Sequence, residues 1–192
     1  VQNKAMTVEE ELAVRDAAGK RSARDRAIID VLLSTGMRVS EIQRINRTDV
    51  DLDDSSITFL GAKNGRYRTV FLDPRARKHL LEYLKERSDA CEALFITENK
   101  YGGICGIEPK RMSKEEYEHV AKQTGKSAGI DRTCTVHVYR KTFATRLADR
   151  ECPLQTIQEL MGHADAGTTA KNYVAKSKAR TKKACEKYLF VA

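Results

Sequence analysis

Residues 57–72 constrain the fold most strongly, because they are the stretch of this 192-residue chain whose pattern predicts β structure. Ile57 and Phe59 alternate with polar residues, and the run from Thr69 to Leu72 follows after the Gly- and Asn-containing piece GAKNGRY. Two such runs joined by a turn-rich piece are typical of a β-hairpin or meander. Elsewhere the apolar residues recur at helical spacing. We therefore predict an α+β fold that is mainly α-helical, with one small antiparallel sheet.

Capping residues indicate where the helices begin and end. Thr7 precedes three glutamates, and Ser22 precedes an apolar helix face that ends at Gly36. Ser113 with Glu116 has the spacing of a capping box. We expect one helix to start at Thr7, one to run from Ser22 to Gly36, and a short one to start at a Ser40 cap. Further helices are expected from Pro74 to about Arg87, from Ser113 to about Ala128, from 137 to 150 and from about 154 to 161. The last two are expected from Thr168 or Thr169 to Tyr173 and from about Lys176 to Leu189.

Length and charge suggest one domain with a polyanionic partner. A chain of 192 residues suits a single core, so we expect one domain at 7–192 after a linker or cut end at 1–6. The net charge of +8 favours a polyanion such as nucleic acid. The chain contains no apolar run long enough to span a bilayer and no signal-peptide pattern, so we expect a cytoplasmic protein.

The cysteines and histidines do not form a metal site. Five cysteines are scattered without a CxxC pair, and none of the four histidines belongs to an HxH or HExxH pair. The GKS at 125–127 lacks the earlier glycine of a phosphate-binding loop. We expect neither a metal nor another cofactor.

A short stretch near the carboxyl end collects groups that can handle a phosphodiester. His137 and Arg140 lie three apart on an expected helix and so share a face, and His163 follows in LMGH. Tyr173 comes ten residues later, after a threonine pair. Upstream, Arg38 follows a helix end in TGMRVSEI. Guanidinium groups are always cationic and forked, which suits the non-bridging oxygens of a phosphate under attack.

These segments resemble the catalytic boxes of the tyrosine recombinase (phage integrase) family. HVYRKTFAT and MGHADAGTTAKNY are similar to the family's second box, GMRVSEI to the first, and GAKNGRYRTV to the hairpin between them. Position 141 is Lys where many members have His, and position 139 is Tyr where many have Leu. The resemblance implies the catalytic residues Arg38, Lys63, His137, Arg140, His163 and Tyr173, with Glu41 holding Arg38 and with Arg66, Arg68 and Lys141 on the DNA backbone.

The expected chemistry assigns a role to each group. A tyrosine with a pKa of about 10 needs a base or a cationic field to become a nucleophile, and His137 could be that base while His163 donates to the phosphate. The leaving 5′-oxygen is strongly basic, so it needs a general acid, for which Lys63 resembles the family's hairpin lysine. Among seven tyrosines, Tyr173 has the GH…TT frame before it.

The resemblance also implies a mechanism and partners. Tyr173 would form a 3′-phosphotyrosine on double-stranded DNA without metal or ATP, within a homotetramer on synapsed sites that can be a monomer off DNA. Accessory DNA-bending or excision factors are expected, and the family's usual amino-terminal DNA-clamping domain is missing. The tail KKACEKYL is similar to that of phage and conjugative-transposon integrases of Gram-positive bacteria. This similarity predicts integration or excision of a mobile element at the bacterial nucleoid.

Two alternative functions and one structural choice remain open. A type IB topoisomerase or telomere resolvase would use the same groups to nick and reseal DNA, and a relative without activity would only bind it. The sequence also leaves open whether the basic terminal helix packs on its own chain or on a neighbouring protomer.

Overall fold

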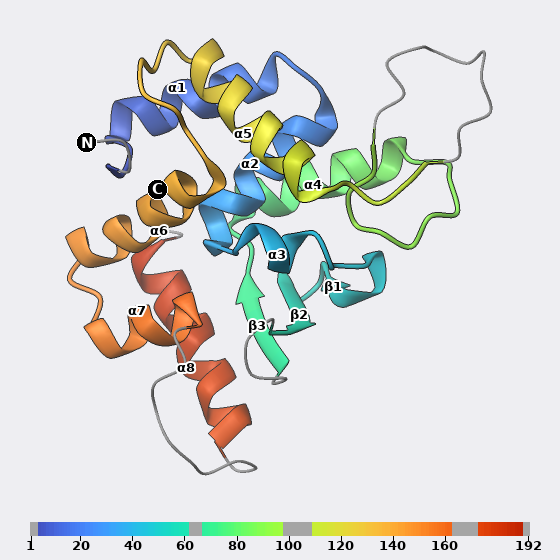
Figure 1. The fold of residues 1–192 in the computed structure, drawn as a ribbon. Helices are drawn as coiled ribbons and strands as arrows, with labels where there is room; N and C mark the ends of the chain where they lie inside the picture. Colours follow the sequence, from blue (N-terminus) through green and yellow to red (C-terminus); the bar gives the residue numbers. More distant parts are fainter. Residues whose placement is uncertain (1–3, 62–66, 98–108, 163–172, 190–192) are drawn as a thin grey trace, which may run out of the picture.

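The computed structural model describes residues 4–61, 67–97, 109–162 and 173–189, with the backbone alone at 173–180. Helices dominate, and one small sheet lies at the side of the molecule, as predicted (Figure 1). The elements are α1 (Val8–Gly19), α2 (Ala23–Thr35), α3 (Val39–Ile42), the 3-10 helix η1 (Arg47–Asp49), β1 (Val50–Asp51), β2 (Ser56–Leu60), β3 (Tyr67–Phe71), α4 (Pro74–Glu86), α5 (Lys114–Ser127), α6 (Val136–Asp149), α7 (Leu154–Met161) and α8 (Tyr173–Tyr188).

Helix α2 is the centre of the core. The sequence predicted one apolar face, but Ile29 and Leu33 are fully buried along with Ile28 and Leu32. Every residue from Ala27 to Thr35 is buried, and α1, α4, α5, α6 and β3 all contact α2. Because α2 is fixed on every side, its carboxyl end is a rigid support for the turn that follows.

Three of the four predicted caps are confirmed. Thr7 and Ser113 form capping boxes with the glutamates three residues on, and the Ser22 side chain accepts from the Asp25 N–H at 3.1 Å. The Ser40 cap is wrong, because the N-cap residue of α3 is Arg38, two positions earlier, and the first turn is closed by a glutamate. The Glu41 carboxylate accepts from the Arg38 N–H at 2.8 Å.

The sheet is a three-stranded antiparallel meander in the order β1-β2-β3. Leu60 pairs with Tyr67 and Ser56 with Phe71, so β2 and β3 form the expected hairpin. The side chain of Thr58 lies 2.9 Å from that of Thr69 across the two strands. Strand β1 adds a short third strand that the sequence did not predict.

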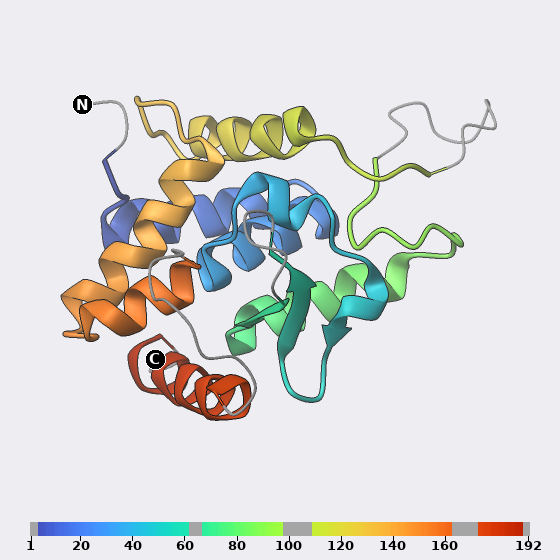
Figure 2. The ribbon, with the colours of Figure 1, turned by 60° about the horizontal axis from the view of Figure 1, so that its bottom comes forward.

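The last helix differs from the prediction. Instead of starting near Lys176, the helix is already formed at Tyr173 and continues to Tyr188 as α8, whereas residues 168–172 of the short helix expected before it lie outside the described ranges. Residues 173–188 contain neither Gly nor Pro, so nothing in the sequence breaks the helix. Figure 2 shows α8, in red, at the lower edge of the molecule, and α8 contacts α7 and β3.

The carboxyl half of α8 packs on its own chain in this structure. Cys185 and Leu189 are buried in a second apolar cluster with Phe143 on α6 and Leu160 on α7. Lys182 also forms an ion pair with Asp54 in the turn between β1 and β2. The terminal helix therefore packs in cis, one of the two arrangements that the sequence left open.

The first described residues are packed rather than free of the domain. The Met6 N–H donates to the Thr142 hydroxyl at 2.9 Å, and the Met6 side chain is buried. The expected linker at 1–6 thus contributes at least Met6 to the domain, while residues 1–3 lie outside the described ranges. Within those ranges, no helix combines the length and apolar character needed to cross a membrane.

Candidate active site

The turn after α2 places Arg38 at the surface. Gly36 ends α2 in the left-handed conformation with φ of 59°, and two residues later Arg38 precedes α3. The Arg38 Nη1 atom donates to Glu41 Oε1 at 3.0 Å, and the Arg38 side chain is 35% exposed. Glu41 therefore orients a guanidinium group that solvent, or a ligand, can still reach.

Arg140 joins the ends of two helices. It lies on α6 and is buried, with Nη1 donating to the Gly36 carbonyl and Nη2 donating to the Met161 carbonyl at 2.5 Å. The last carbonyls of a helix lack intrahelical partners, so a cation there supplies bonds and offsets the partial negative charge. Burial and the charge of Arg38 lower the pKa of Arg140 to about 10, which leaves it protonated at neutral pH.

Arg68 is a third guanidinium in the same place. The sequence predicted a contact to the DNA backbone, but the side chain of Arg68 points into the protein. Its Nη1 atom donates to Glu41 Oε2 at 3.0 Å, and its Nη2 atom donates to the Leu160 carbonyl. A buried carboxylate and an unpaired helix-end carbonyl attract it inward. The sequence signal was an arginine near the start of an expected strand, which does not reveal these partners.

Among the described residues, Glu41 is the acidic group at the centre of this arginine cluster, defined as Arg38, Arg68 and Arg140. Its side chain is 2% exposed. Burial alone would raise the pKa of Glu41, but the charge of Arg68 and the backbone bond from Arg38 outweigh burial and keep this pKa below its ordinary value. One carboxylate faces three guanidinium groups, so the cluster keeps a positive charge that favours an anion.

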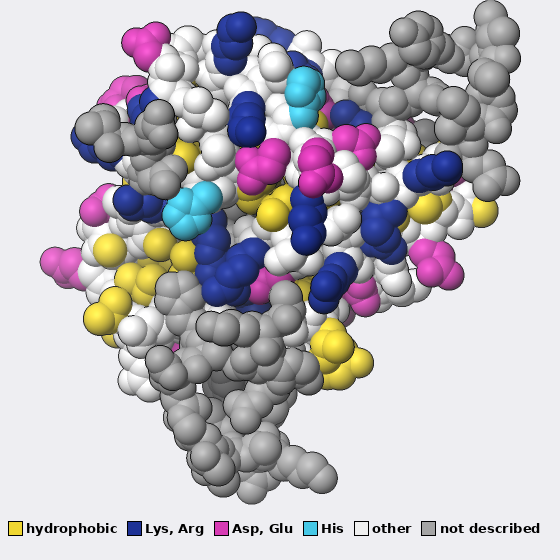
Figure 3. Space-filling view, in the orientation of Figure 1, with side chains coloured by type: hydrophobic (Ala, Val, Ile, Leu, Met, Phe, Trp, Pro, Cys, Tyr) yellow, Lys and Arg dark blue, Asp and Glu magenta, His cyan; other side chains and the backbone are white. Residues whose placement is uncertain are grey.

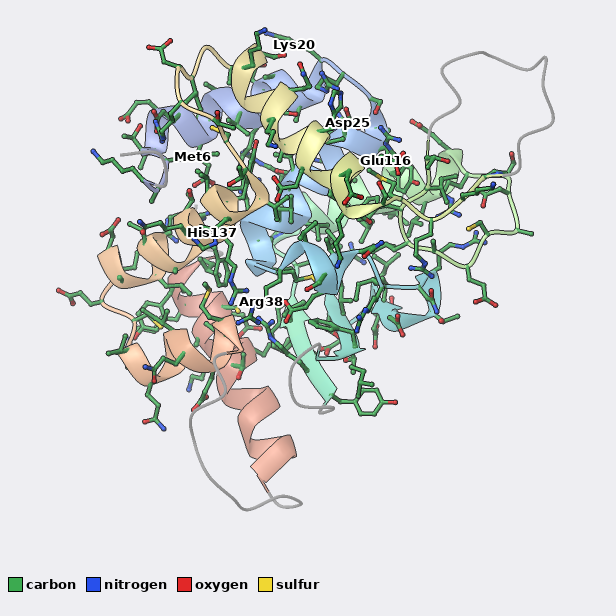
Figure 4. The ribbon with its side chains drawn as sticks, in the orientation of Figure 1. Met6, Lys20, Asp25, Arg38, Glu116 and His137 are labelled. Carbon is green, nitrogen blue, oxygen red and sulfur yellow. The ribbon has the colours of Figure 1, made fainter. Side chains whose placement is uncertain are left out.

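The cluster opens onto a basic face. Figure 3 shows Lys and Arg side chains gathered beside a histidine on this face. In the same orientation, Figure 4 shows His137 on α6 in the same region as Arg38. His137 and Lys141 are both exposed, whereas Arg140 between them is buried, so the HxxR spacing places one exposed and one buried group around a common helix turn.

Several predicted residues cannot be placed. Lys63, Arg66 and His163 lie outside the described residues, although Gly162, directly before His163, ends α7 beside Arg68. Tyr173 is the first residue of α8, and its side chain is not described. Figures 1 and 2 show that the amino-terminal end of α8 points away from α2 and α6.

Burial removes three other tyrosines from consideration as nucleophiles. Tyr83, Tyr117 and Tyr139 are each at most 5% exposed. Burial raises the pKa of all three hydroxyls, so their ionised forms are disfavoured. Tyr67 is 79% exposed, and Tyr188 lies at the far end of α8 from Tyr173.

Comparison with known proteins agrees with this geometry. The phage integrase family model matches residues 4–180. Tyrosine recombinase XerA of Pyrococcus furiosus is 31% identical over 166 residues, covering 86% of this chain and 55% of that protein. The crystal structure of XerA recombinase matches with a TM-score of 0.74 at 29% identity, covering 92% of this chain and 58% of that chain.

A further solved structure shares the fold. XerH site-specific recombinase bound to its difH substrate matches with a TM-score of 0.69 at 23% identity, covering 93% of this chain and 54% of that chain. The chain thus spans little more than half the length of the relatives that it matches. The family match extends over the arginine cluster and the start of α8, and the chain belongs to the phage integrase family of tyrosine recombinases.

Proposed function

We propose that this chain is the catalytic part of a site-specific DNA recombinase that cuts and rejoins strands through a 3′-phosphotyrosine at Tyr173. The observation that carries the proposal is the meeting of Arg38 and Arg140 around Glu41, although they are far apart in sequence. Attack on a phosphodiester adds negative charge to its non-bridging oxygens, which fixed guanidinium groups stabilise. Removing one such group typically lowers the rate about 10²–10³-fold.

The remaining roles follow from the chemistry of the step. His137 acts as the base for the Tyr173 hydroxyl, His163 donates to the phosphate, and Lys63 protonates the leaving 5′-oxygen. The phosphotyrosine retains the energy of the broken bond, so a free 5′-hydroxyl can reverse the step. No cofactor enters this scheme.

The position of α8 sets a condition on the mechanism. Because the amino-terminal end of α8 points away from α2 and α6, Tyr173 has to reach the arginine cluster by a repositioning of its segment, or to come from a neighbouring protomer. Mixing Tyr173→Phe chains with Arg140→Ala chains separates the two routes. Cleavage recovered in the mixture supports supply from a neighbour, and cleavage by the wild-type chain alone at high dilution supports movement within one chain.

The proposed partner is double-stranded DNA, bound by a homotetramer on two synapsed sites in the bacterial cytoplasm at the nucleoid. A separate amino-terminal domain that clamps the duplex, and accessory bending or excision factors, belong to this proposal. The biological role that we propose is integration or excision of a mobile element of a Gram-positive bacterium. That role rests on the KKACEKYL tail alone, since the named relatives are Xer recombinases.

Trapping the covalent adduct tests the proposal. A pool of duplexes with randomised arms carries a nick beside the cleavage position, so that the cleaved end diffuses away and the adduct accumulates. Proteolysis and mass spectrometry then identify the modified residue. We expect the adduct on Tyr173 and none with Tyr173→Phe, which should still retain duplex DNA.

Tyr188→Phe is the matched control, because it makes the same change on the same helix outside the proposed site. It should form the adduct at the wild-type rate. An adduct that survives in Tyr173→Phe refutes the assigned nucleophile, and a wild-type chain that binds DNA but never forms an adduct refutes the catalytic proposal. Relaxation of supercoiled plasmid without exchange between two sites would point to a topoisomerase instead.

A further inference from the structure

Arg68 connects three parts of the site. It is the second residue of β3, its guanidinium lies 5.7 Å from the centre of the Phe59 ring on β2, and its side chain is 12% exposed. One terminal nitrogen donates to Glu41 at the start of α3, and the other donates to the Leu160 carbonyl in the last turn of α7. The hairpin, the Arg38 turn and the end of α7 are therefore held by one side chain.

The surroundings of Arg68 leave its guanidinium little access to DNA. A Cβ atom at Gly162 would lie 3.0 Å from the Cζ, Nε and Nη1 atoms of Arg68, so a glycine is packed directly on this group. The Nε atom is buried and has no hydrogen-bond partner among the described residues. Burial lowers the pKa of Arg68, and the charge of Glu41 opposes this shift. Arg68 is placed to act through protein groups.

Sharing Glu41 between two arginines changes the charge available at the exposed one. A carboxylate that faced Arg38 alone would neutralise most of its charge and hold its guanidinium in a closed pair. Because Glu41 Oε2 also accepts from Arg68, part of the negative charge is balanced on the buried side. The guanidinium of Arg38, 35% exposed, then keeps positive charge for an incoming anion.

We propose that Arg68 is a positioning residue of the recombinase reaction: it shares the Glu41 carboxylate so that Arg38 can bind the scissile phosphate, and it ties the end of α7 to β3. The inference rests on the proposed function, because it concerns the same site. The bond from Arg68 to the Leu160 carbonyl holds the end of α7, and His163 directly follows Gly162, the residue that ends this helix. Loss of Arg68 therefore disturbs the groups that hold the scissile phosphate, although Arg68 itself does not contact DNA.

Kinetics of adduct formation on the nicked duplex test this role. At saturating DNA, Arg68→Gln should form the adduct up to about 100-fold more slowly, because small misplacements of reacting groups have effects of this order. The dissociation constant for DNA should change much less than the rate, because Arg68 itself makes no phosphate contact and the rest of the duplex is bound as before. Arg68→Lys keeps the charge but cannot hold both acceptors in the same way, so its rate should be intermediate.

A double-mutant cycle with Glu41 gives the sharper test. Glu41→Gln should slow the wild-type chain, because Arg38 loses its anchor. The same substitution in the Arg68→Gln background should have a smaller effect or restore part of the rate, because it removes the carboxylate that would otherwise neutralise Arg38. A role of Arg68 in stability alone predicts that Arg68→Gln leaves the adduct rate unchanged in both backgrounds, since each variant is assayed below its own unfolding transition.

Arg132→Gln is the control, because it removes a paired arginine outside the site, where Arg132 binds Glu10 of α1. It should leave the adduct rate unchanged. Three results would overturn the inference: a wild-type rate in Arg68→Gln, strict additivity with Glu41→Gln, or a loss of DNA affinity as large as the loss of rate, which is the sign of a direct phosphate contact. If the wild-type and Arg132→Gln chains form no adduct, the proposed function fails separately. If Arg68→Gln does not fold, Arg68→Lys carries the comparison.

Discussion

Substitution of Gly36 by alanine should destabilise the protein by an amount that the structure allows us to divide into two parts. Gly36 has φ of +59°, and holding a residue with a Cβ atom in the left-handed region requires about 1–2 kcal/mol. The new Cβ would also lie 2.5 Å from Cδ1 of Phe143, a ring that is 1% exposed. Forcing an extra carbon into a packed core requires about 1–3 kcal/mol more. We expect Gly36→Ala to lower the free energy of unfolding by about 2–5 kcal/mol.

Gly129 provides the matched control. Its φ is +75°, but a Cβ atom there would meet nothing within 4 Å. Gly129→Ala should therefore lower the free energy of unfolding by about 1–2 kcal/mol, the backbone part alone. The difference between the two variants measures the contact with the Phe143 ring.

Urea unfolding followed by circular dichroism supplies both free energies through linear extrapolation. The combination of Gly36→Ala with Phe143→Leu should destabilise less than the sum of the two single changes, since the smaller side chain leaves room for the new methyl group. Equal losses in Gly36→Ala and Gly129→Ala, or a strictly additive double variant, would show that the ring moves aside freely. The claim of tight packing between the end of α2 and α6 would then be wrong.

Two further predictions concern groups outside the arginine cluster. The hydrogen bonds from Arg132 hold the pKa of Glu10 at about 2, below its ordinary 4.5, so this contribution to stability is complete above pH 4.5 and is lost as the pH falls toward 2. Glu10→Gln should therefore have a lower free energy of unfolding than wild type at pH 7, and the difference between the two should shrink as the pH falls. A difference that does not change with pH contradicts the assignment. Tyr139→Phe removes a buried hydroxyl that donates to the Ala121 carbonyl at 3.0 Å, so it should lower the free energy of unfolding by about 1 kcal/mol and leave the adduct rate unchanged. Urea titration and the adduct assay check this together, and a large fall in adduct rate would reopen the choice of nucleophile.

Local signals predicted most of the fold. The caps at Thr7, Ser22 and Ser113 and the left-handed end at Gly36 depend on residues within a few positions of each other, and all are confirmed. The same reasoning was wrong at Ser40, where the side chain of Glu41 closes the first turn instead. It was also wrong near the carboxyl end, where a run without Gly or Pro continues as one helix.

The site was predicted less completely than the fold. Resemblance to the family selected Arg38, Glu41 and Arg140, and the structure brings these three together. Arg68 was expected to face DNA, because its sequence neighbours are those of a basic hairpin. Its actual partners, Glu41 and the Leu160 carbonyl, lie 27 and 92 positions away.

The sequence by itself determined most helix ends, the hairpin and the residue types that a phosphodiester site requires, because short-range hydrogen bonding and side-chain chemistry depend on neighbouring residues. Only the tertiary structure decided that Arg38 and Arg68 share one buried carboxylate beside Arg140, and that Arg68 and Arg140 bind the carbonyls at the end of α7. Those contacts depend on how α6, α7 and β3 pack, and the free energy of that packing comes from apolar surfaces that leave no local pattern around the arginines.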